Sequence, residues 1–386
     1  SIKMKGSIIL LLMLSACSVR ASDENQIEFF FYGMWYCIES LVYDIFHWSE
    51  PVTPDAFKTI PELIMTAGYR FETHKIVTED QYINTAWRIV GKLNDTDPPM
   101  KKPCVILQHG LLDNSATWLI QNASNALPFL LVDQGYDVWM TNSRGNINSF
   151  EHMHPETHYV FDPSGQYYDF TWDDMGKYDV PANLNYVLAH SSYKKAFYVG
   201  HSQGTTQFFV AADVYKDLGD KIAGFIALGP VMYVGNMYSP YVRMLIKSGV
   251  FSLLNFVNLK NFLLLPNELS PIIRYLANHL RHFIWRIIGL ICGIDEKITV
   301  DLERMPVMGN HEPGGSSLMN MFHWIRMIND GVFSYHDYGS KEENMKHYKQ
   351  ETPPLYNTQN IAETFKKFPS YLIAGGNDCL VSKYDL

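Results

Sequence analysis

The feature of this 386-residue chain that restricts its fold most is a short apolar run followed by a pentapeptide and then by a helix-forming run. The pentapeptide is Gly200-His201-Ser202-Gln203-Gly204. The first run, Ala196 to Val199, has the length and composition of a buried strand, and Gln203 to Tyr215 has helical periodicity. The pattern G-x-S-x-G between a strand and a helix predicts a tight, strained turn that exposes the serine hydroxyl. Gly200 and Gly204 are expected there because a side chain at either position would collide with neighbouring backbone.

Other apolar runs repeat the alternation of strand and helix. We expect buried strands at Cys104 to Gln108, Tyr136 to Met140, Ala196 to Val199, Ile222 to Leu228 and Tyr371 to Ala374, with a helix at Val180 to Ala189. Strands that alternate with helices imply a parallel sheet covered on both faces. The sequence therefore predicts an α/β fold of the α/β-hydrolase kind.

The alternation stops between residues 231 and 357, where the sequence becomes helical and strongly apolar. We interpret this block as a helical cap inserted into the α/β-hydrolase core, which then comprises residues 56–230 and 358–386. Most apolar faces of the cap pack on the core, but their abundance between Phe251 and Ile291 suggests that some contact an apolar substrate. Residues 22–55 form an N-terminal extension, rich in aromatic residues, to which the sequence assigns no role.

The beginning of the chain resembles a secretory signal peptide at residues 1–21. Lys3 and Lys5 precede the apolar run Ser7 to Leu14, and small and polar residues follow as far as Ala21. The run is too short to span a bilayer, although an N-terminal anchor or a bacterial lipoprotein signal are alternatives. A secretory route predicts a secreted or lysosomal protein, with sequons for glycosylation at Asn94 and Asn122.

Charge and histidine spacing exclude several classes of partner. The formal net charge of −9 argues against nucleic acid, which needs clustered Lys and Arg. His152, His154 and His158 lie close together, but they lack cysteines and regular ligand spacing, so we expect them to be solvated. Nothing in the sequence requires a metal or a cofactor, and the sequence does not indicate an oligomeric state.

The pentapeptide makes Ser202 the candidate nucleophile for acyl transfer. An acyl-transfer nucleophile needs hydrogen-bond donors for the oxyanion, and the backbone N–H of the next residue, Gln203, is one. The second donor should come from the loop after an earlier strand, where Gly110 permits close approach and Leu111 offers its N–H. His109 either is a satisfied loop histidine or shapes the pocket.

Asp378 is the candidate acid that orients the imidazole, because it follows the run Tyr371 to Ala374 in a glycine turn. The histidine should come after the acid, yet none occurs between Cys379 and Leu386. We therefore expect the last part of the core, with the catalytic histidine, to be missing from this sequence. Little or no hydrolysis is expected without that base.

These residues resemble the acid-lipase family, which comprises gastric, lysosomal acid and insect lipases. The resemblance runs from about Pro61 to the end of the sequence. It is carried by Val77-Thr78-Glu79-Asp80, Gln108-His109-Gly110-Leu111, Gly135-Tyr136-Asp137-Val138-Trp139, Asn142-Ser143-Arg144-Gly145-Asn146, Lys177-Tyr178-Asp179-Val180-Pro181-Ala182, the Ser202 pentapeptide with Thr205-Thr206, Phe322-His323-Trp324, Pro353-Pro354-Leu355-Tyr356-Asn357 and Gly375-Gly376-Asn377-Asp378.

The resemblance implies a capped α/β-hydrolase that hydrolyses triacylglycerols or sterol esters at a lipid–water interface, with Ser202, Asp378, Leu111 and Gln203 in the roles given above. Two departures from the family pattern stand out. Gln81 replaces a glycine of an early hairpin turn. Cys292 matches a family cysteine that forms a disulfide within the cap, but Phe283 occupies the partner position, so that disulfide is not expected and the cap is expected to be looser.

Two other functions stay open. A lipid carrier that keeps the cap but has lost the base would bind lipid without turnover, although nothing but catalysis obviously requires the strained turn. An esterase or acyltransferase for small esters would share the nucleophile, although the apolar block favours bulky lipid. We expect a serine lipase.

Overall fold

The computed structural model describes residues 24–385 apart from 96–98, 155–165, 265–269 and 294–300. The expected signal peptide, His158 and the threonine of the Asn94 sequon lie outside the described residues. The central sheet has eight strands, in the order β1-β2-β4-β3-β6-β7-β10, with β5 paired to β2. Their bounds are β1 Tyr69–Val77, β2 Tyr82–Lys92, β3 Cys104–Gln108, β4 Asp137–Thr141, β5 Glu151–His152, β6 Ala196–His201, β7 Ile222–Leu228 and β10 Ser370–Ile373.

The strands from β4 to β10 in this order run parallel, and β1 and β2 add an antiparallel edge. Parallel strands between two layers of helices are buried on both faces, and β3 and β4 are buried along their whole length. The expectation of a buried strand at Tyr371 to Ala374 is wrong in one respect, because β10 is exposed at all four positions. Among the described residues it is the last strand of the sheet and pairs with β7 alone. Cys104 and Ile106 of β3 point into one core, and Val105 and Leu107 point into the other. This alternation separates two hydrophobic cores, one on each face of the sheet.

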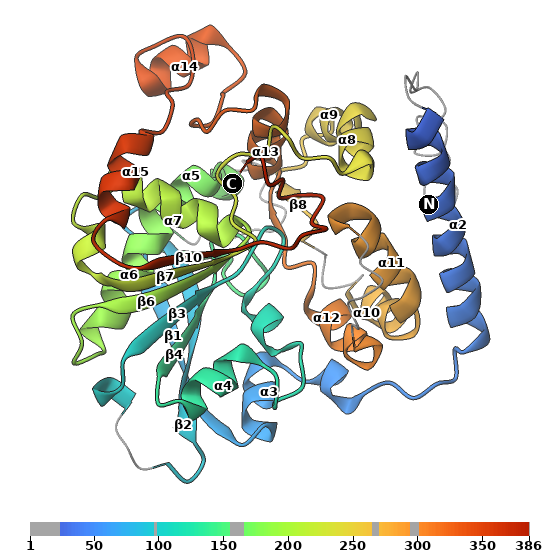
Figure 1. The fold of residues 1–386 in the computed structure, drawn as a ribbon, viewed down its shortest axis with the longest axis horizontal. Helices are drawn as coiled ribbons and strands as arrows, with labels where there is room; N and C mark the ends of the chain where they lie inside the picture. Colours follow the sequence, from blue (N-terminus) through green and yellow to red (C-terminus); the bar gives the residue numbers. More distant parts are fainter. Residues whose placement is uncertain (1–23, 96–98, 155–165, 265–269, 294–300, 386) are drawn as a thin grey trace.

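Each core is closed by its own set of helices. The first contains side chains from α5 (Trp172–Asp174), α6 (Val180–Ala189), α7 (Gln203–Val214) and α15 (Thr358–Phe365). The second contains side chains from α3 (Ile60–Thr66) and α4 (Leu127–Asp133). The sheet is therefore a layer between two layers of helices (Figure 1). This is the predicted α/β-hydrolase fold.

In the described part of the chain, seven α-helices and a short strand pair lie between β7 and α15. They are α8 (Pro240–Lys247), α9 (Val250–Phe256), β8 (Asn261–Phe262), α10 (Ser270–His279), α11 (Arg281–Cys292), α12 (Met305–His311), β9 (Ser316–Ser317), α13 (Leu318–Asp330) and α14 (Lys341–Tyr348). Figure 1 shows most of them grouped to one side of the sheet and above its carboxyl ends. The helical content of this block agrees with a cap, and we keep the division into core and cap as an interpretation.

The N-terminal extension contains a long helix, α2 (Glu24–Phe46), that lies along α11 of the cap and away from the sheet (Figure 1). The buried Asp44 fixes its end, because the carboxylate accepts hydrogen bonds from the Phe283 N–H (2.8 Å) and pairs with His282 Nδ1 (2.7 Å). These groups lie in the first turn of α11, where unpaired N–H groups and the helix dipole favour an anion. No helix among the described residues is long and apolar enough to cross a membrane.

Predicted element bounds agree closely with the structure. Cys104–Gln108, Ile222–Leu228 and Val180–Ala189 coincide with β3, β7 and α6. At the early hairpin, Gln81 adopts a φ of 76°, a left-handed conformation that costs a side-chain-bearing residue about 1–2 kcal/mol. The replacement of glycine therefore strains the turn without changing its course.

Candidate active site

Ser202 lies at the corner between β6 and α7, at the carboxyl edge of the sheet. Its φ is 49° and its ψ is −120°, so it has the strained backbone that the pentapeptide predicted. The Ser202 N–H donates to Leu228 O at 2.9 Å, and its carbonyl accepts from the Thr205 N–H at 2.8 Å. The turn is thus fixed on one side by β7 and on the other by the first turn of α7.

The two glycines of the pentapeptide are required by neighbouring backbone. A Cβ added at Gly204 would lie 2.7 Å from the carbonyl oxygens of both Gln108 and His109. A Cβ added at Gly200 would lie 2.9 Å from the carbonyl carbon of Gly204. These atoms belong to rigid strands and helices, so a side chain at either glycine forces the backbone to shift.

The loop that follows β3 passes directly beside Ser202. A Cβ built on Gly110 would lie 3.1 Å from Ser202 Cβ, and the half-buried Leu111 is the next residue. The structure therefore brings together the four positions that the sequence singled out for nucleophile and oxyanion donors: Gly110, Leu111, Ser202 and Gln203.

His109 holds this loop from inside the protein. It is 2% exposed, its Nδ1 is 2.9 Å from Gly110 O, and its Nε2 is 3.0 Å from the Ser143 N–H nitrogen. Burial lowers the pKa of His109, so the ring is neutral. Because Ser143 can only donate, Nε2 is the acceptor and Nδ1 carries the proton. Of the two alternatives for His109, the satisfied loop histidine agrees with the structure.

A buried pair of carboxyl groups joins this loop to the cap, and sequence reasoning missed it. Glu312 accepts hydrogen bonds from the Asn114 N–H (3.2 Å) and Nδ2 (2.9 Å). Burial and the neighbouring Asp113 carboxylate raise the pKa of Glu312 well above its usual range. Burial opposes ionisation of Asp113, but the neighbouring His201 and Glu312 side chains lower its pKa to about 2. A neutral Glu312 therefore lies beside an ionised Asp113, whose carboxylate accepts from the Gly110 N–H at 3.4 Å.

Helix α13 of the cap clamps the residue after the nucleophile. The side chain of Gln203 is buried, and its Oε1 accepts from Asn320 Nδ2 (2.9 Å) and Trp324 Nε1 (2.7 Å). Asn320 and Trp324 lie on the same face of α13, four residues apart. Trp324 belongs to the Phe322-His323-Trp324 motif, but its sequence gave no indication of its partner.

Asp378 lies in the turn that follows β10. Its Oδ1 accepts from the N–H groups of Leu380 (2.8 Å) and Val381 (3.1 Å). Among the described residues, no histidine is hydrogen-bonded to Asp378, so the structure places the acid in a turn of the expected kind without an imidazole partner.

The remaining predicted positions lie at the surface. Asn94 is exposed after β2, and the exposed Asn122 donates to Asp301 Oδ2 at 3.0 Å. The rings of His152 and His154 are tilted to one another, with centroids 5.6 Å apart; His154 is exposed and His152 is half-buried. Within the described ranges, no group of three or more His, Cys, Asp or Glu residues is placed to hold a metal ion.

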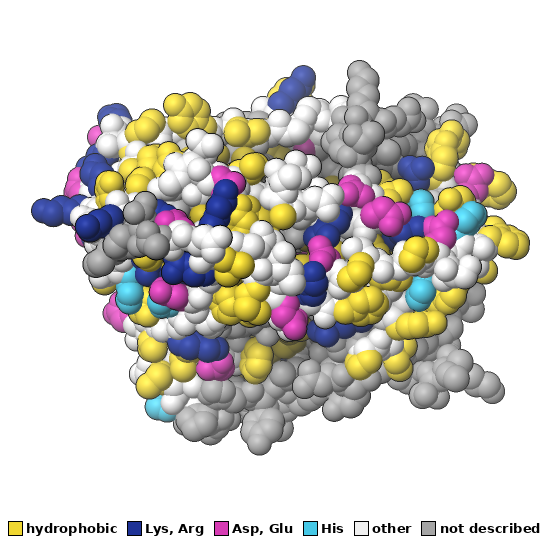
Figure 2. Space-filling view, turned by 90° about the horizontal axis from the view of Figure 1, so that it is seen from below, with side chains coloured by type: hydrophobic (Ala, Val, Ile, Leu, Met, Phe, Trp, Pro, Cys, Tyr) yellow, Lys and Arg dark blue, Asp and Glu magenta, His cyan; other side chains and the backbone are white. Residues whose placement is uncertain are grey.

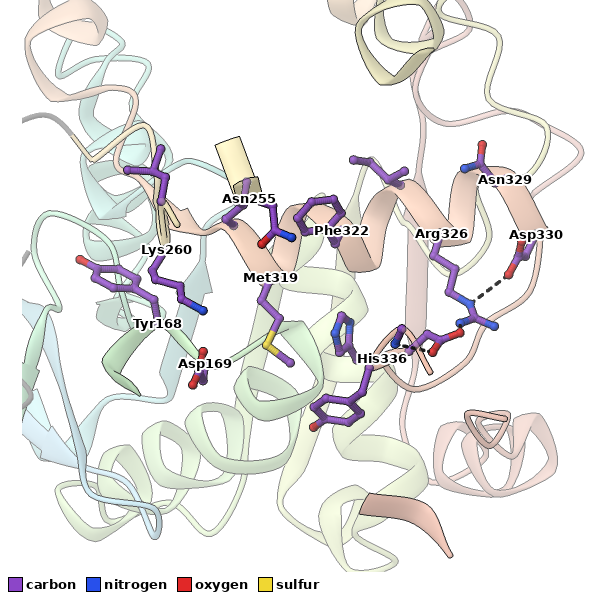
Figure 3. A pocket seen from close by; sticks show the side chains of 16 residues that line it. Tyr168, Asp169, Asn255, Lys260, Met319, Phe322, Arg326, Asn329, Asp330 and His336 are labelled. Atoms are coloured by element: carbon purple, nitrogen blue, oxygen red, sulfur yellow. Dashed lines mark hydrogen bonds and ion pairs between the residues drawn. The ribbon is translucent and has the colours of Figure 1, made fainter. Parts of the chain in front are cut away.

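A cavity of about 760 Å³ lies on the opposite face of α13 from the Gln203 clamp. Figure 3 shows Met319, Phe322 and Arg326 pointing into it from α13, with Tyr168 and Lys260 across from them. Arg326 is paired with Asp330 and Asp337. None of the lining residues belongs to the Ser202 corner or to the loop at Gly110, so the cavity is separate from the candidate nucleophile.

Comparison with known proteins identifies the family. Residues 60–122 match the model of a partial alpha/beta-hydrolase lipase region, and residues 103–283 match that of the alpha/beta hydrolase fold. The chain is 34% identical to human lysosomal acid lipase/cholesteryl ester hydrolase, over 87% of this chain and 82% of that protein. It is also 34% identical to rat gastric triacylglycerol lipase, with the same shares covered, and to mouse lipase member K. The chain belongs to the acid-lipase family. Its membership makes it a carboxylic ester hydrolase of the α/β-hydrolase fold.

In this member of the acid-lipase family, the α2 helix lies along α11, away from the candidate site. The site itself is built from the loop after β3, the corner after β6 and the turn after β10, all at the carboxyl edge of the sheet. Open parallel sheets bind ligands at that edge because loops from neighbouring strands meet there.

Proposed function

We propose that this chain is a serine lipase that hydrolyses the carboxylic ester bonds of neutral lipids, triacylglycerols or sterol esters, through an acyl-enzyme. The observation that carries the proposal is the strained Ser202 (φ 49°) directly beside the loop at Gly110. The relatives named above are a cholesteryl ester hydrolase and a triacylglycerol lipase, which supports the substrate class.

The proposed chemistry assigns one role to each group. Ser202 Oγ attacks the ester carbonyl carbon and gives its proton to an imidazole base. The amides of Leu111 and Gln203 donate to the oxyanion of the tetrahedral intermediate. The alcohol then leaves with that proton, and water hydrolyses the acyl-enzyme by the same steps. Asp378 orients the imidazole and stabilises it when it is protonated.

The 386 residues contain no histidine after Asp378, so we assign the base to no residue of this sequence. His201 is adjacent to Ser202, and its Nδ1 lies 3.8 Å from the Asp113 carboxylate. His109 is fixed by the loop and is buried. His109 is therefore not free to take the Ser202 proton.

We place the contact with the lipid–water interface on the outer face of α2 and on α10. Large apolar side chains on these helices are exposed, with Trp35 59% and Phe46 81% accessible to solvent. The others are Tyr32, Ile38, Val42, Tyr43, Ile45, Ile272, Tyr275 and Leu276. Figure 2 shows one face of the molecule, on which hydrophobic side chains lie among charged and histidine side chains. Tryptophan and tyrosine combined with aliphatic side chains are typical of surfaces at a membrane–water boundary.

Charge specifies the kind of interface. Residues 24–48 contain no Lys or Arg, so attraction to anionic lipid contributes little there. An uncharged or zwitterionic lipid surface therefore fits this face best. The proposal includes a secreted or lysosomal location, with glycans at the exposed Asn94 and Asn122, because one relative is named a lysosomal and another a gastric lipase.

The test of the catalytic role uses added imidazole as the base. Fatty acid release from emulsified long-chain triacylglycerol is measured with the 386-residue chain, its Ser202→Ala variant and Ser192→Ala, an exposed serine, as matched control. We expect little release without imidazole, and a rate that rises with imidazole concentration in the wild type and in Ser192→Ala only. An imidazole-dependent rate in Ser202→Ala as high as in the wild type would exclude Ser202 as the nucleophile.

The two alternatives give different results in the same assay. A small-ester esterase would hydrolyse a short soluble ester faster than the emulsion. A non-catalytic carrier would bind long-chain lipid without any release that depends on Ser202, whatever the imidazole concentration.

The interface is tested by binding to emulsions of triacylglycerol and phosphatidylcholine. A Trp35→Ser and Phe46→Ser double variant should lose binding. The matched control, Leu130→Ser with Tyr193→Ser, changes two exposed apolar residues away from α2 and α10 and should retain it.

A further inference from the structure

The end of cap helix α11 and the turn that carries Asp378 meet through their backbones. The Cys379 N–H donates to Cys292 O at 2.8 Å, and the Tyr238 N–H donates to Cys379 O at 3.2 Å. Cys292 is the last residue of α11, whose final carbonyls have no partner within the helix. The turn therefore satisfies a carbonyl at the end of the helix, and both polar groups of the Cys379 backbone are bonded to the cap side.

The next residue of the cap shows how closely the two segments pack. Gly293 has a φ of 110°, and a Cβ added there would overlap Asn377 O and lie 3.2 Å from Cys379 Sγ. The sulfur of the half-buried Cys379 thus lies close to the backbone at the end of α11. Only a residue without a side chain fits at position 293 in this packing.

Two cysteines joined by such a hydrogen bond are at the right separation for a disulfide. With standard bond lengths, an N–H···O=C bond places the two Cα atoms roughly 5–6 Å apart, and disulfides span a Cα separation of about 4.4–6.8 Å. The two thiols are also close enough to interact electrostatically. Burial, Asp378 and Cys379 together raise the pKa of the Cys292 thiol to about 11.

We propose that Cys292 and Cys379 form a disulfide that ties the end of α11 to the Asp378 turn. Cys292 is partly buried at the end of α11, and its carbonyl already accepts from the Cys379 N–H. The bond would fix the acid-bearing turn to the cap, and this inference holds whether or not Ser202 is the nucleophile.

The oxidation is a thiol–disulfide exchange with a small disulfide such as oxidised glutathione. One cysteine thiolate attacks a glutathione sulfur and releases one glutathione as its thiol. The second cysteine thiolate then attacks the mixed disulfide, forms the Cys292–Cys379 bond and releases the second glutathione. The protein loses two electrons and two protons in total. Because thiolate is the attacking species and the thiol pKa values are raised, the reaction should accelerate as the pH rises from 7 toward 9.

The test is peptide mapping of the full chain without reduction. The folded protein is treated with oxidised glutathione at about pH 8.5, unfolded, alkylated with iodoacetamide and digested. We expect one linked peptide that contains Cys292 and Cys379, with Cys37 and the buried Cys104 alkylated. In Cys379→Ser, Cys292 should be fully alkylated, whereas Cys37→Ser should keep the linked peptide.

A second measurement separates the disulfide from a packing role of Cys379. The melting temperature of the wild type should rise on oxidation and return on reduction, because closing a long loop restricts the unfolded chain. Cys379→Ser should melt like the reduced wild type and be insensitive to oxidant. Full alkylation of Cys292 in the oxidised wild type would overturn the proposal, as would a link from Cys292 to Cys17 or Cys37.

Discussion

Replacing His109 by alanine tests whether the loop beside Ser202 depends on one buried ring. The ring receives a hydrogen bond from the Ser143 N–H and donates one to Gly110 O. Alanine leaves both backbone groups buried without these partners, and each costs about 1–3 kcal/mol. Asn146 Nδ2, which is also 3.0 Å from His109 Nε2, keeps Asn142 Oδ1 at 3.1 Å as an acceptor. We therefore expect His109→Ala to lower the free energy of unfolding by about 2–5 kcal/mol.

Two milder variants divide this loss between the bonds. His109→Asn can restore the donor to Gly110 O, and His109→Gln can restore an acceptor for the Ser143 N–H. Each should recover roughly half of the loss, about 1–2 kcal/mol. The assay is urea unfolding followed by tryptophan fluorescence, with the denaturant slope checked for each variant. A loss below about 1 kcal/mol in His109→Ala, or three variants of equal stability, would refute the claim that these two bonds hold the loop.

Three further predictions concern the same framework. Gly204→Ala should lower the free energy of unfolding in urea by about 1–3 kcal/mol, because its Cβ would meet two carbonyl oxygens at 2.7 Å. Gly376→Ala is the control, because no atom lies within 4 Å of its new Cβ. Equal losses in the two variants would contradict the steric reason. Gln81→Gly should gain about 0.5–1 kcal/mol by relieving the φ of 76°, since the strain exceeds the added flexibility of glycine, and a loss of stability would show that the turn is not strained. Burial lowers the pKa of His311 to about 4, so the unfolded chain takes up a proton between about pH 6.5 and 4 and the native protein does not. Stability from this group is therefore lost as the pH falls through that window. Relative to the wild type, the free energy of unfolding of His311→Gln should rise by up to about 3 kcal/mol between pH 7 and pH 4, measured by thermal unfolding. A difference that stays constant across these pH values would contradict the prediction.

The position of the nucleophile could be read from the sequence because its cause is local. Gly200, Ser202 and Gly204 lie within five residues, and the strand and helix on either side follow from short-range patterns of apolar residues. The same holds for the strands β3 and β7, whose apolar runs begin and end at the bounds of the structure. Such runs form strands in a parallel sheet whatever the distant parts of the chain do, although the exposed run of β10 shows that burial also depends on what packs beside the strand.

Contacts across the fold could not be read in this way. The carboxyl pair of Asp113 and Glu312 joins positions that are far apart in the sequence, and so does the clamp of Asn320 and Trp324 on Gln203. A glutamate or an asparagine in a helical segment is ordinary on its own, and only its burial against a partner gives it a role. The same is true of Cys292 and Cys379, whose pairing depends on where the turn after β10 meets the end of α11.

The sequence by itself determined the strand–turn–helix corner at Ser202, the parallel sheet behind it and the glycine loop beside it, because sterics and apolar periodicity act over a few residues. The tertiary structure alone decided that His109 is a neutral support, that the cap grips the loop through Glu312 and Gln203, and that α2 turns an aromatic face to solvent. These properties arise from burial and proximity, which set the pKa of a side chain, the need for a hydrogen-bond partner and the exposure of a surface. They are fixed only when segments that lie far apart in the sequence pack together.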